Sequence, residues 1–269
     1  VADAFAPGLR TAGGSEAILV QVEGEPEWAD RIADALHLTM ARHGVTLSDV
    51  IVTADGYYRS RLCDDAECCP PQGRAVPGSS ALMTATVATG RVIGNSRDDL
   101  AHEIVAPDAA AAARADRVVA LFVAALPHGS VIASPDEVDA LLARARAAVA
   151  ENRDVGLDDA VRLALMLADG DVRDMTYANL FTAGEEVHRA LWASVCRLLP
   201  REYCAAPLAF FALSAYLDGS GAVANVALAA AKEVDCAHPT VGLVDDLVAE
   251  AISPRVVRAT LAHATARPG

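Results

Sequence analysis

The sequence predicts an α+β protein, with a small α/β unit at the N-terminus and a larger all-helical region of antiparallel helical hairpins after it. Three observations predict this class: a β-branched run near residue 18, a hairpin signal at Asp55-Gly56, and helical spacing of apolar residues through most of the chain beyond residue 78. We therefore expect residues 1–78 to form the α/β unit, with a cysteine-rich loop, and residues 79–269 to form the helical region.

The N-terminal unit is predicted element by element. Residues 18–23 (ILVQVE) have the apolar, β-branched character of a buried strand, and Pro26 begins a segment with apolar residues on one helical face that ends at Gly44. Residues 47–62 then predict strand, turn and strand, because Asp55-Gly56 suits the positive φ values of a tight hairpin turn. This order predicts a sheet with the helix on one face.

The helical region contains several segments that begin at favourable N-caps. Ser134 precedes a first-turn proline and two carboxylates, and Ser96-Arg97-Asp98-Asp99 resembles a capping box. Short joints between the segments predict antiparallel hairpins. The alanine-rich helices near 184–265 suggest packing like tetratricopeptide repeats, with an ordinary helical bundle as the alternative. The expected helices are 79–89, 96–105, 107–126, 134–152, 157–169, 184–199, 201–217, 220–234, 239–251 and 253–265.

Composition and charge exclude several functional classes. The chain has 269 residues, of which 53% are hydrophobic, and this excludes a disordered chain. A net charge of −14 argues against nucleic-acid binding, which requires clustered Lys and Arg. The longest apolar stretch, residues 207–217, is too short to cross a bilayer, and residues 1–10 lack the pattern of a secretory signal. We expect a cytoplasmic protein that binds neither nucleic acid nor membrane.

Three of the six cysteines, Cys63, Cys68 and Cys69, lie within seven residues directly after the predicted hairpin. Zinc usually takes four ligands, so a fourth, such as His102 or an acidic neighbour, would have to join them. Three interpretations stay open: a zinc site, a reversible disulfide from Cys63 to Cys68 or Cys69, and a structural loop in which the thiols pack as small apolar groups.

The charges around these cysteines argue against a strongly activated nucleophile. Asp64, Asp65 and Glu67 lie between or beside the thiols in the sequence. Negative charges raise the pKa of a nearby thiol and so lower its thiolate fraction at neutral pH. The usual motifs of hydrolases, nucleotide-binding loops and zinc proteases are absent from the sequence, so no reaction and no cofactor other than zinc is indicated.

Two further segments carry polar residues with an expected structural role. Glu185 and His188 share a helical face, but di-iron bundles need this motif twice, so we expect His188 to be a surface or boundary residue beside Trp192. Between residues 169 and 174 we expect a helix junction at which Arg173 and Asp174 form an ion pair or cap the next helix, with contact to a partner or ligand as the alternative.

A resemblance to a known family is carried by segments that include 55–60 (DGYYRS), 68–70 (CCP), 172–174 (VRD), 207–209 (PLA) and 218–221 (DGSG). These segments resemble an actinobacterial family catalogued as domain of unknown function 4192. The resemblance extends over nearly the whole chain and implies that the chain lacks an N-terminal stretch that family members usually carry. The family has no established activity, so the resemblance supports the fold and the compartment alone.

These observations support three functional hypotheses. The first is a binding or protein-interaction module whose helical array offers an acidic groove or surface to a protein partner. The second is an enzyme of unrecognised class with a site where Asp55, Tyr57 and Arg59 meet the cysteine loop, assisted by Arg97. The third makes the cysteine loop a structural zinc or redox clip. The sequence specifies neither a substrate nor an oligomeric state.

Overall fold

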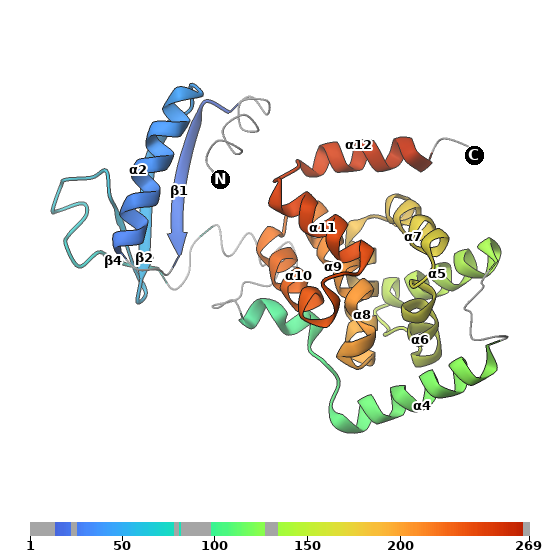
Figure 1. Ribbon diagram of the computed structural model, residues 1–269. Coiled ribbons are helices and arrows are strands. Elements are labelled where there is room, and N and C mark those ends of the chain that lie inside the picture. Colours follow the sequence, from blue (N-terminus) through green and yellow to red (C-terminus); the bar gives the residue numbers. More distant parts are fainter. Residues whose placement is uncertain (1–13, 23–25, 78–80, 82–97, 127–133, 266–269) are drawn as a thin grey trace. The chain divides into compact units, whose positions relative to one another are not determined.

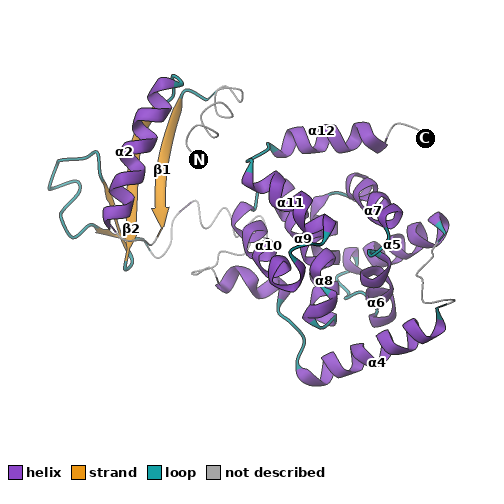
Figure 2. Cartoon of the chain, in the orientation of Figure 1, coloured by secondary structure: helices purple, strands orange, loops and turns teal. Residues whose placement is uncertain are grey.

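A computed structural model describes residues 14–22, 26–77, 81, 98–126 and 134–265 of the chain (Figure 1). The chain divides into two compact units, residues 1–93 and 94–269. The described strands form one sheet in the first unit, whereas the second unit is built from helices (Figure 2). The predicted α+β class is therefore confirmed.

The sheet unit has the predicted order of strand, helix, strand and strand, followed by a short fourth strand. The strands are arranged in the order β1-β2-β3-β4, with β1 parallel to β2 and the other pairs antiparallel. Since parallel neighbours require a crossover, α2 connects β1 to β2. The elements are β1 (Glu16–Val22), α2 (Pro26–Arg42), β2 (Thr46–Ala54), β3 (Tyr57–Ser60) and β4 (Arg74–Ala75).

Helix α2 covers one face of the sheet. Its Ala33 packs with Leu47, Val50 and Val52 of β2 in a small buried core. The turn between β2 and β3 is the predicted tight hairpin turn, because Asp55 and Gly56 have φ values of 51° and 79°. The two-residue strand β4 has no signal in the sequence, since a pair of residues is too short to show a period-2 pattern.

The helical unit encloses a single large core. Its elements are η1 (Asp98–Ile104), α4 (Ala109–Ala125), α5 (Pro135–Ala150), α6 (Leu157–Met166), α7 (Gly170–Ala183), α8 (Glu185–Leu198), η3 (Arg201–Tyr203), α9 (Ala205–Leu217), α10 (Gly221–Asp235), α11 (Pro239–Ala249) and α12 (Pro254–Thr265). The core includes residues from η1 to α12, so distant parts of this unit pack together.

Helix α9 is the centre of this unit, surrounded by α8, α10 and α11 (Figure 1). Apart from Tyr216, each of its residues is buried. Ser214, the polar residue within this apolar stretch, donates a hydrogen bond from Oγ to the carbonyl of Phe210 at 2.8 Å, so it is satisfied inside the helix. The ring of Phe210 stacks on Trp192 of α8, with 5.1 Å between the ring centroids.

Most of the predicted helices agree with the observed ones to within a few residues. The N-cap at Ser134 is confirmed as a capping box with Glu137. The segment predicted as a helix over 96–105 is a 3₁₀-helix over Asp98–Ile104, and the prediction for 79–89 lies outside the described residues except at residue 81. Within the described part of the chain, no helix is both long and apolar enough to cross a bilayer.

The sequence prediction missed helix α7. The expected junction is present, because α6 ends at Met166 and α7 begins at Gly170, but no helix was predicted over residues 170–183. Asp169 is the N-cap of this 14-residue helix, and its carboxylate accepts a hydrogen bond from the backbone N–H of Asp171 at 2.8 Å. Acidic residues in a first turn stabilise a helix through its dipole. The acidic residues therefore lie at a helix junction and also form the first turn of the second helix.

Candidate functional site

The cysteine loop connects β3 to β4 and is held by backbone contacts of Asp65. The carboxylate of Asp65 accepts hydrogen bonds from the backbone N–H groups of Glu67 at 2.8 Å and Cys68 at 3.3 Å. Its carbonyl accepts a third bond from the N–H of Cys69 at 2.6 Å. Since these bonds fix the backbone of Cys68 and Cys69, Asp65 orients two of the three thiols.

Arg74, the first residue of β4, holds the other side of the loop. Its Nε donates to the carbonyl of Cys68 at 2.5 Å, and its Nη2 donates to the carbonyl of Glu67 at 2.7 Å. Gly73, just before it, has a φ of 78° and lies against the carbonyl of Tyr58, where a Cβ atom would come within 3.0 Å. The close return of the chain at Gly73 therefore places Arg74 against the loop.

The three thiols of the loop lie together. The sulfur atoms of Cys63, Cys68 and Cys69 are all within 4.8 Å of one another, and no other His, Cys, Asp or Glu among the described residues joins them at that separation. Cys68 is exposed, whereas Cys63 and Cys69 are half-buried, and all three are free thiols. The arrangement has the ligand chemistry and the compactness to hold a metal ion.

The three thiols differ in acidity. The pKa of Cys69 lies below its ordinary value, chiefly because of a hydrogen bond with the backbone of Ser60. Partial burial opposes this shift, whereas hydrogen bonds with Cys63 and Cys68 and the charge of Arg74 add to it. For Cys63 the backbone of Asp65 lowers the pKa, but hydrogen bonds with Cys69 and Cys68 and partial burial outweigh it and raise the pKa above its ordinary value. The sequence analysis expected Asp64, Asp65 and Glu67 to raise the pKa of the thiols, and for Cys69 this expectation is wrong.

The hairpin residues expected near the cysteine loop lie along β3 and its turn. Asp55 is at the turn, Tyr57 begins β3 and is 47% exposed, and Arg59 is exposed on the same strand. Tyr57 and Arg59 share one face of β3 because side chains alternate along a strand. On the other face, the hydroxyl of Ser60 donates to the carboxylate of Asp49 at 2.5 Å, a pair that the sequence analysis did not identify.

The remaining candidate residues lie elsewhere. Arg97 lies outside the described residues. Arg173 donates from Nη1 to the carbonyls of Leu167 and Ala168, at 3.0 and 2.8 Å, and so caps the end of α6, while Asp174 is exposed on α7. These two residues belong to the helical unit, whereas the thiols belong to the sheet unit.

His188 is fully buried, so the expectation of a surface or boundary residue was wrong. Its Nε2 lies 3.0 Å from the carbonyl oxygen of Asn179. Burial lowers the pKa of His188 to about 4, the hydrogen bond to Asn179 opposes the shift, and the charge of Arg146 adds to it. His188 is therefore a neutral core residue at neutral pH, in contact with the end of α7.

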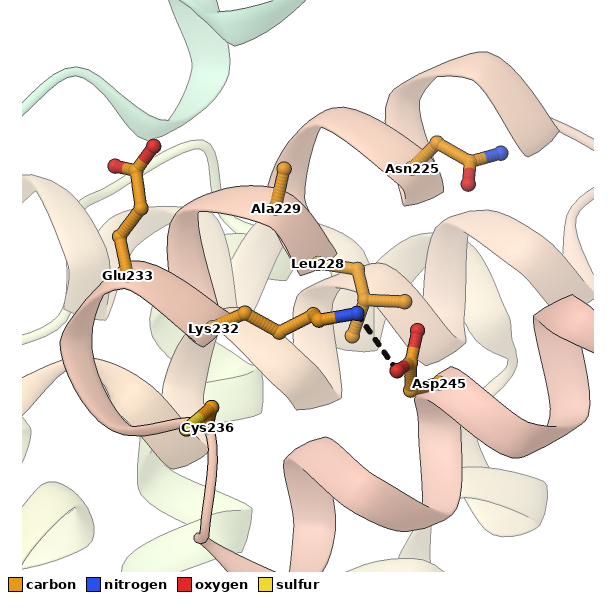
Figure 3. Close-up of a pocket in the computed structure, with 7 residues that line it drawn as sticks. All are labelled: Asn225, Leu228, Ala229, Lys232, Glu233, Cys236 and Asp245. Atoms are coloured by element: carbon orange, nitrogen blue, oxygen red, sulfur yellow. Dashed lines mark hydrogen bonds and ion pairs between the residues drawn. The ribbon is translucent and has the colours of Figure 1, made fainter.

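A pocket of about 560 Å³ lies between α10 and α11 (Figure 3). The ammonium of Lys232, which is the single lysine of the chain, points across it to the carboxylate of Asp245 at 2.7 Å. A second pocket, of about 420 Å³, lies beside η3 and the end of α10 and includes Tyr203 and His238. The first pocket is lined by Asn225, Leu228, Ala229, Lys232, Glu233, Cys236 and Asp245.

The fold and the loop together define an α+β chain with a thiol cluster on a small sheet and a separate helical array. The sequence profile of the family described as Domain of unknown function (DUF4192) matches residues 1–255. This match covers most of the chain, and the chain belongs to that family. No curated protein and no solved structure shows a significant match.

Proposed function

We propose that this chain is a binding module whose sheet unit holds a thiophilic divalent metal ion, zinc, at Cys63, Cys68 and Cys69. The observation that carries the proposal is the separation of the three sulfur atoms, all within 4.8 Å of one another. A zinc–sulfur distance of about 2.3 Å in a tetrahedral site sets sulfur atoms about 3.8 Å apart. The thiols therefore need to approach one another by at most about 1 Å.

The surroundings of the thiols support metal binding. Outer hydrogen bonds that orient the ligands contribute strongly to the affinity of metal sites. Here Asp65 fixes the backbone of Cys68 and Cys69, and Arg74 fixes the carbonyl of Cys68. Ligation requires thiolates, so this function also calls for a reducing compartment, and we propose a cytoplasmic location on that ground.

The metal content of the full chain tests this function. We expect one zinc or cobalt ion per chain after reconstitution under reducing conditions, with the sulfur-to-cobalt charge-transfer absorption of thiolate ligands. Cys69→Ser should lose most of the affinity. Cys236→Ser is the matched control, because Cys236 is an exposed thiol of the helical unit. A cobalt complex without charge-transfer absorption, or equal affinity in both variants, contradicts the proposal.

A second candidate function is protein interaction through the helical unit. It is favoured by the pocket between α10 and α11, in which Leu228 and Ala229 supply apolar surface beside the charged side chains of Lys232, Glu233 and Asp245 (Figure 3). Helical arrays commonly bind partners along such surfaces. Native mass spectrometry of the gently purified protein, compared with Ala229→Arg, tests this role. A stoichiometric partner that the variant loses supports it, and a partner that both forms retain places the interaction elsewhere.

A further inference from the structure

The cysteine loop supplies three ligands, whereas structural zinc sites have four from the protein. All six cysteines lie among the described residues. Cys196 and Cys204 are buried in the core of the helical unit, so neither is available to a site in the loop. Cys236 at the end of α10 and His102 in η1 are exposed, and both belong to the helical unit. Among the described residues, the group of ligand atoms within 4.8 Å of one another therefore consists of the three thiols of the loop.

The carboxylates of the loop do not complete the ligand set. Asp65 is committed to two backbone N–H groups of the loop. Asp64 and Glu67 are exposed, and neither joins the group of sulfur atoms at 4.8 Å. Cys68 and all the residues from Asp64 to Glu67 are exposed, so the loop leaves the cluster accessible to solvent.

We propose that a metal ion at Cys63, Cys68 and Cys69 keeps one coordination position open to solvent and accepts there a neutral nitrogen donor, the imidazole of a histidine from another molecule. This inference rests on the proposed metal site. It links the two candidate functions, because a partner that presents a histidine would bind to the sheet unit through the metal. Three thiolates and one imidazole form a common zinc ligand set.

The charge around the loop selects a neutral donor. A divalent ion with three thiolates carries a net charge of −1, and the segment 61–74 adds three carboxylates against two arginines, Arg61 and Arg74. A fourth ligand that is an anion would therefore approach a region that is already negative, whereas imidazole adds no charge. The side chains of Asp65 and Arg74 form the hydrogen bonds that hold the loop, whereas the exposed carboxylates of Asp64 and Glu67 take no part in these bonds.

Cobalt-loaded full-length protein, titrated with imidazole and in parallel with azide, tests the inference. Both probes are nitrogen donors, but azide carries a negative charge. We expect imidazole to shift the d–d absorption of cobalt with one ligand bound per metal, and to reach half-saturation at a concentration at least tenfold lower than azide. Asp64→Asn combined with Glu67→Gln should reduce this preference, because the double variant removes two negative charges.

Each other outcome overturns a distinct part of the argument. A d–d spectrum that imidazole leaves unchanged shows that the fourth position is already filled, and azide binding as tight as imidazole refutes the selection by charge. Both results leave the metal site itself intact. Absence of sulfur-to-cobalt charge transfer before any probe is added refutes the metal site, and the inference with it.

Discussion

The guanidinium of Arg189 forms an ion pair with the carboxylate of Glu103, which lies 86 residues earlier in the chain, and Nε donates to Oε2 at 3.0 Å. The same guanidinium donates from Nη1 to the carboxylate of Asp218 at 3.3 Å and to the hydroxyl of Ser220 at 3.2 Å. Arg189 therefore ties η1 and the turn between α9 and α10 to helix α8.

Replacing Arg189 by Met is expected to destabilise the helical unit. The side chains of Arg189 and Glu103 are only 18% and 23% exposed, so the change leaves the carboxylate of Glu103 partly desolvated without this cation. We expect a loss of about 2 kcal/mol in the free energy of unfolding, below the value for fully buried pairs because solvent screens this one. Arg144→Met is the control, since Arg144 is 55% exposed, and it should cost less than about 1 kcal/mol. Equal losses in urea unfolding contradict the assignment.

Because burial lowers the pKa of His188, we expect the stability of the folded chain to depend on pH. Its pKa is about 4 in the folded chain against about 6.5 in the unfolded chain, so between these values the unfolded state binds more protons. The contribution of His188 to the free energy of unfolding is therefore complete above pH about 6.5, and it falls by roughly 1 kcal/mol per pH unit as the pH is lowered toward 4. His188→Gln should flatten the slope in this window when unfolding by denaturant is measured at several pH values. An unchanged slope means that another group titrates there.

The thiols should differ in their rates of alkylation. The pKa of Cys69 is lowered and that of Cys63 is raised, whereas burial raises the pKa of Cys196 well above its ordinary value. Because the thiolate is the reactive form, iodoacetamide should modify Cys69 before Cys63 in the metal-free protein and should leave Cys196 untouched until the chain unfolds. Peptide mapping by mass spectrometry at short reaction times gives the order. Faster labelling of Cys63 than of Cys69 is the contrary result.

Asp65 should contribute to metal affinity without being a ligand. Asp65→Ala removes the acceptor for the N–H groups of Glu67 and Cys68, so the loop must be ordered when the metal binds. We expect a loss of roughly tenfold in cobalt affinity, as is typical of outer hydrogen bonds at metal sites. Asp65→Asn keeps an acceptor oxygen and should restore most of the affinity, while Asp64→Ala controls for the loss of charge. Failure of Asp65→Asn to restore binding assigns the effect to charge.

Gly73 and Gly56 form a matched pair in the sheet unit. Both have a positive φ, near 78°, but a Cβ atom on Gly73 would lie 3.0 Å from the carbonyl oxygen of Tyr58, whereas Gly56 faces open space. Alanine at either position introduces backbone strain of about 1 kcal/mol, and the contact at Gly73 adds to it. Gly73→Ala should therefore increase amide hydrogen exchange in β3 more than Gly56→Ala does. Equal effects indicate that Tyr58 moves aside.

The sequence was sufficient to predict the elements whose periodicity is strong. The strand before Pro26, the hairpin at Asp55-Gly56 and the helix that begins after Ser134 are all confirmed. Each of these depends on local turn chemistry, capping or apolar spacing, which the sequence displays directly. Helix α7 was missed because its acidic start resembles a junction, although those residues also suit a helix N-terminus.

The candidate site was predictable in part. The spacing of Cys63, Cys68 and Cys69 identified the loop, but it did not indicate that the backbone of Ser60 and the charge of Arg74 lower the pKa of Cys69. These contacts depend on the return of the chain to β4. Burial of His188 likewise depends on how α7 and α8 pack, and no local pattern encodes that.

Each compact unit carries one of the two tryptophans of the chain, Trp28 in α2 and Trp192 in α8. Trp192 is fully buried against Phe210, so its fluorescence emission should be blue-shifted and resistant to quenching by acrylamide. In a Trp28→Phe variant the emission reports on the helical unit alone. Comparison with the unmodified chain then reveals whether the units melt together or one at a time, and cobalt bound to the loop should raise the melting temperature of the sheet unit alone.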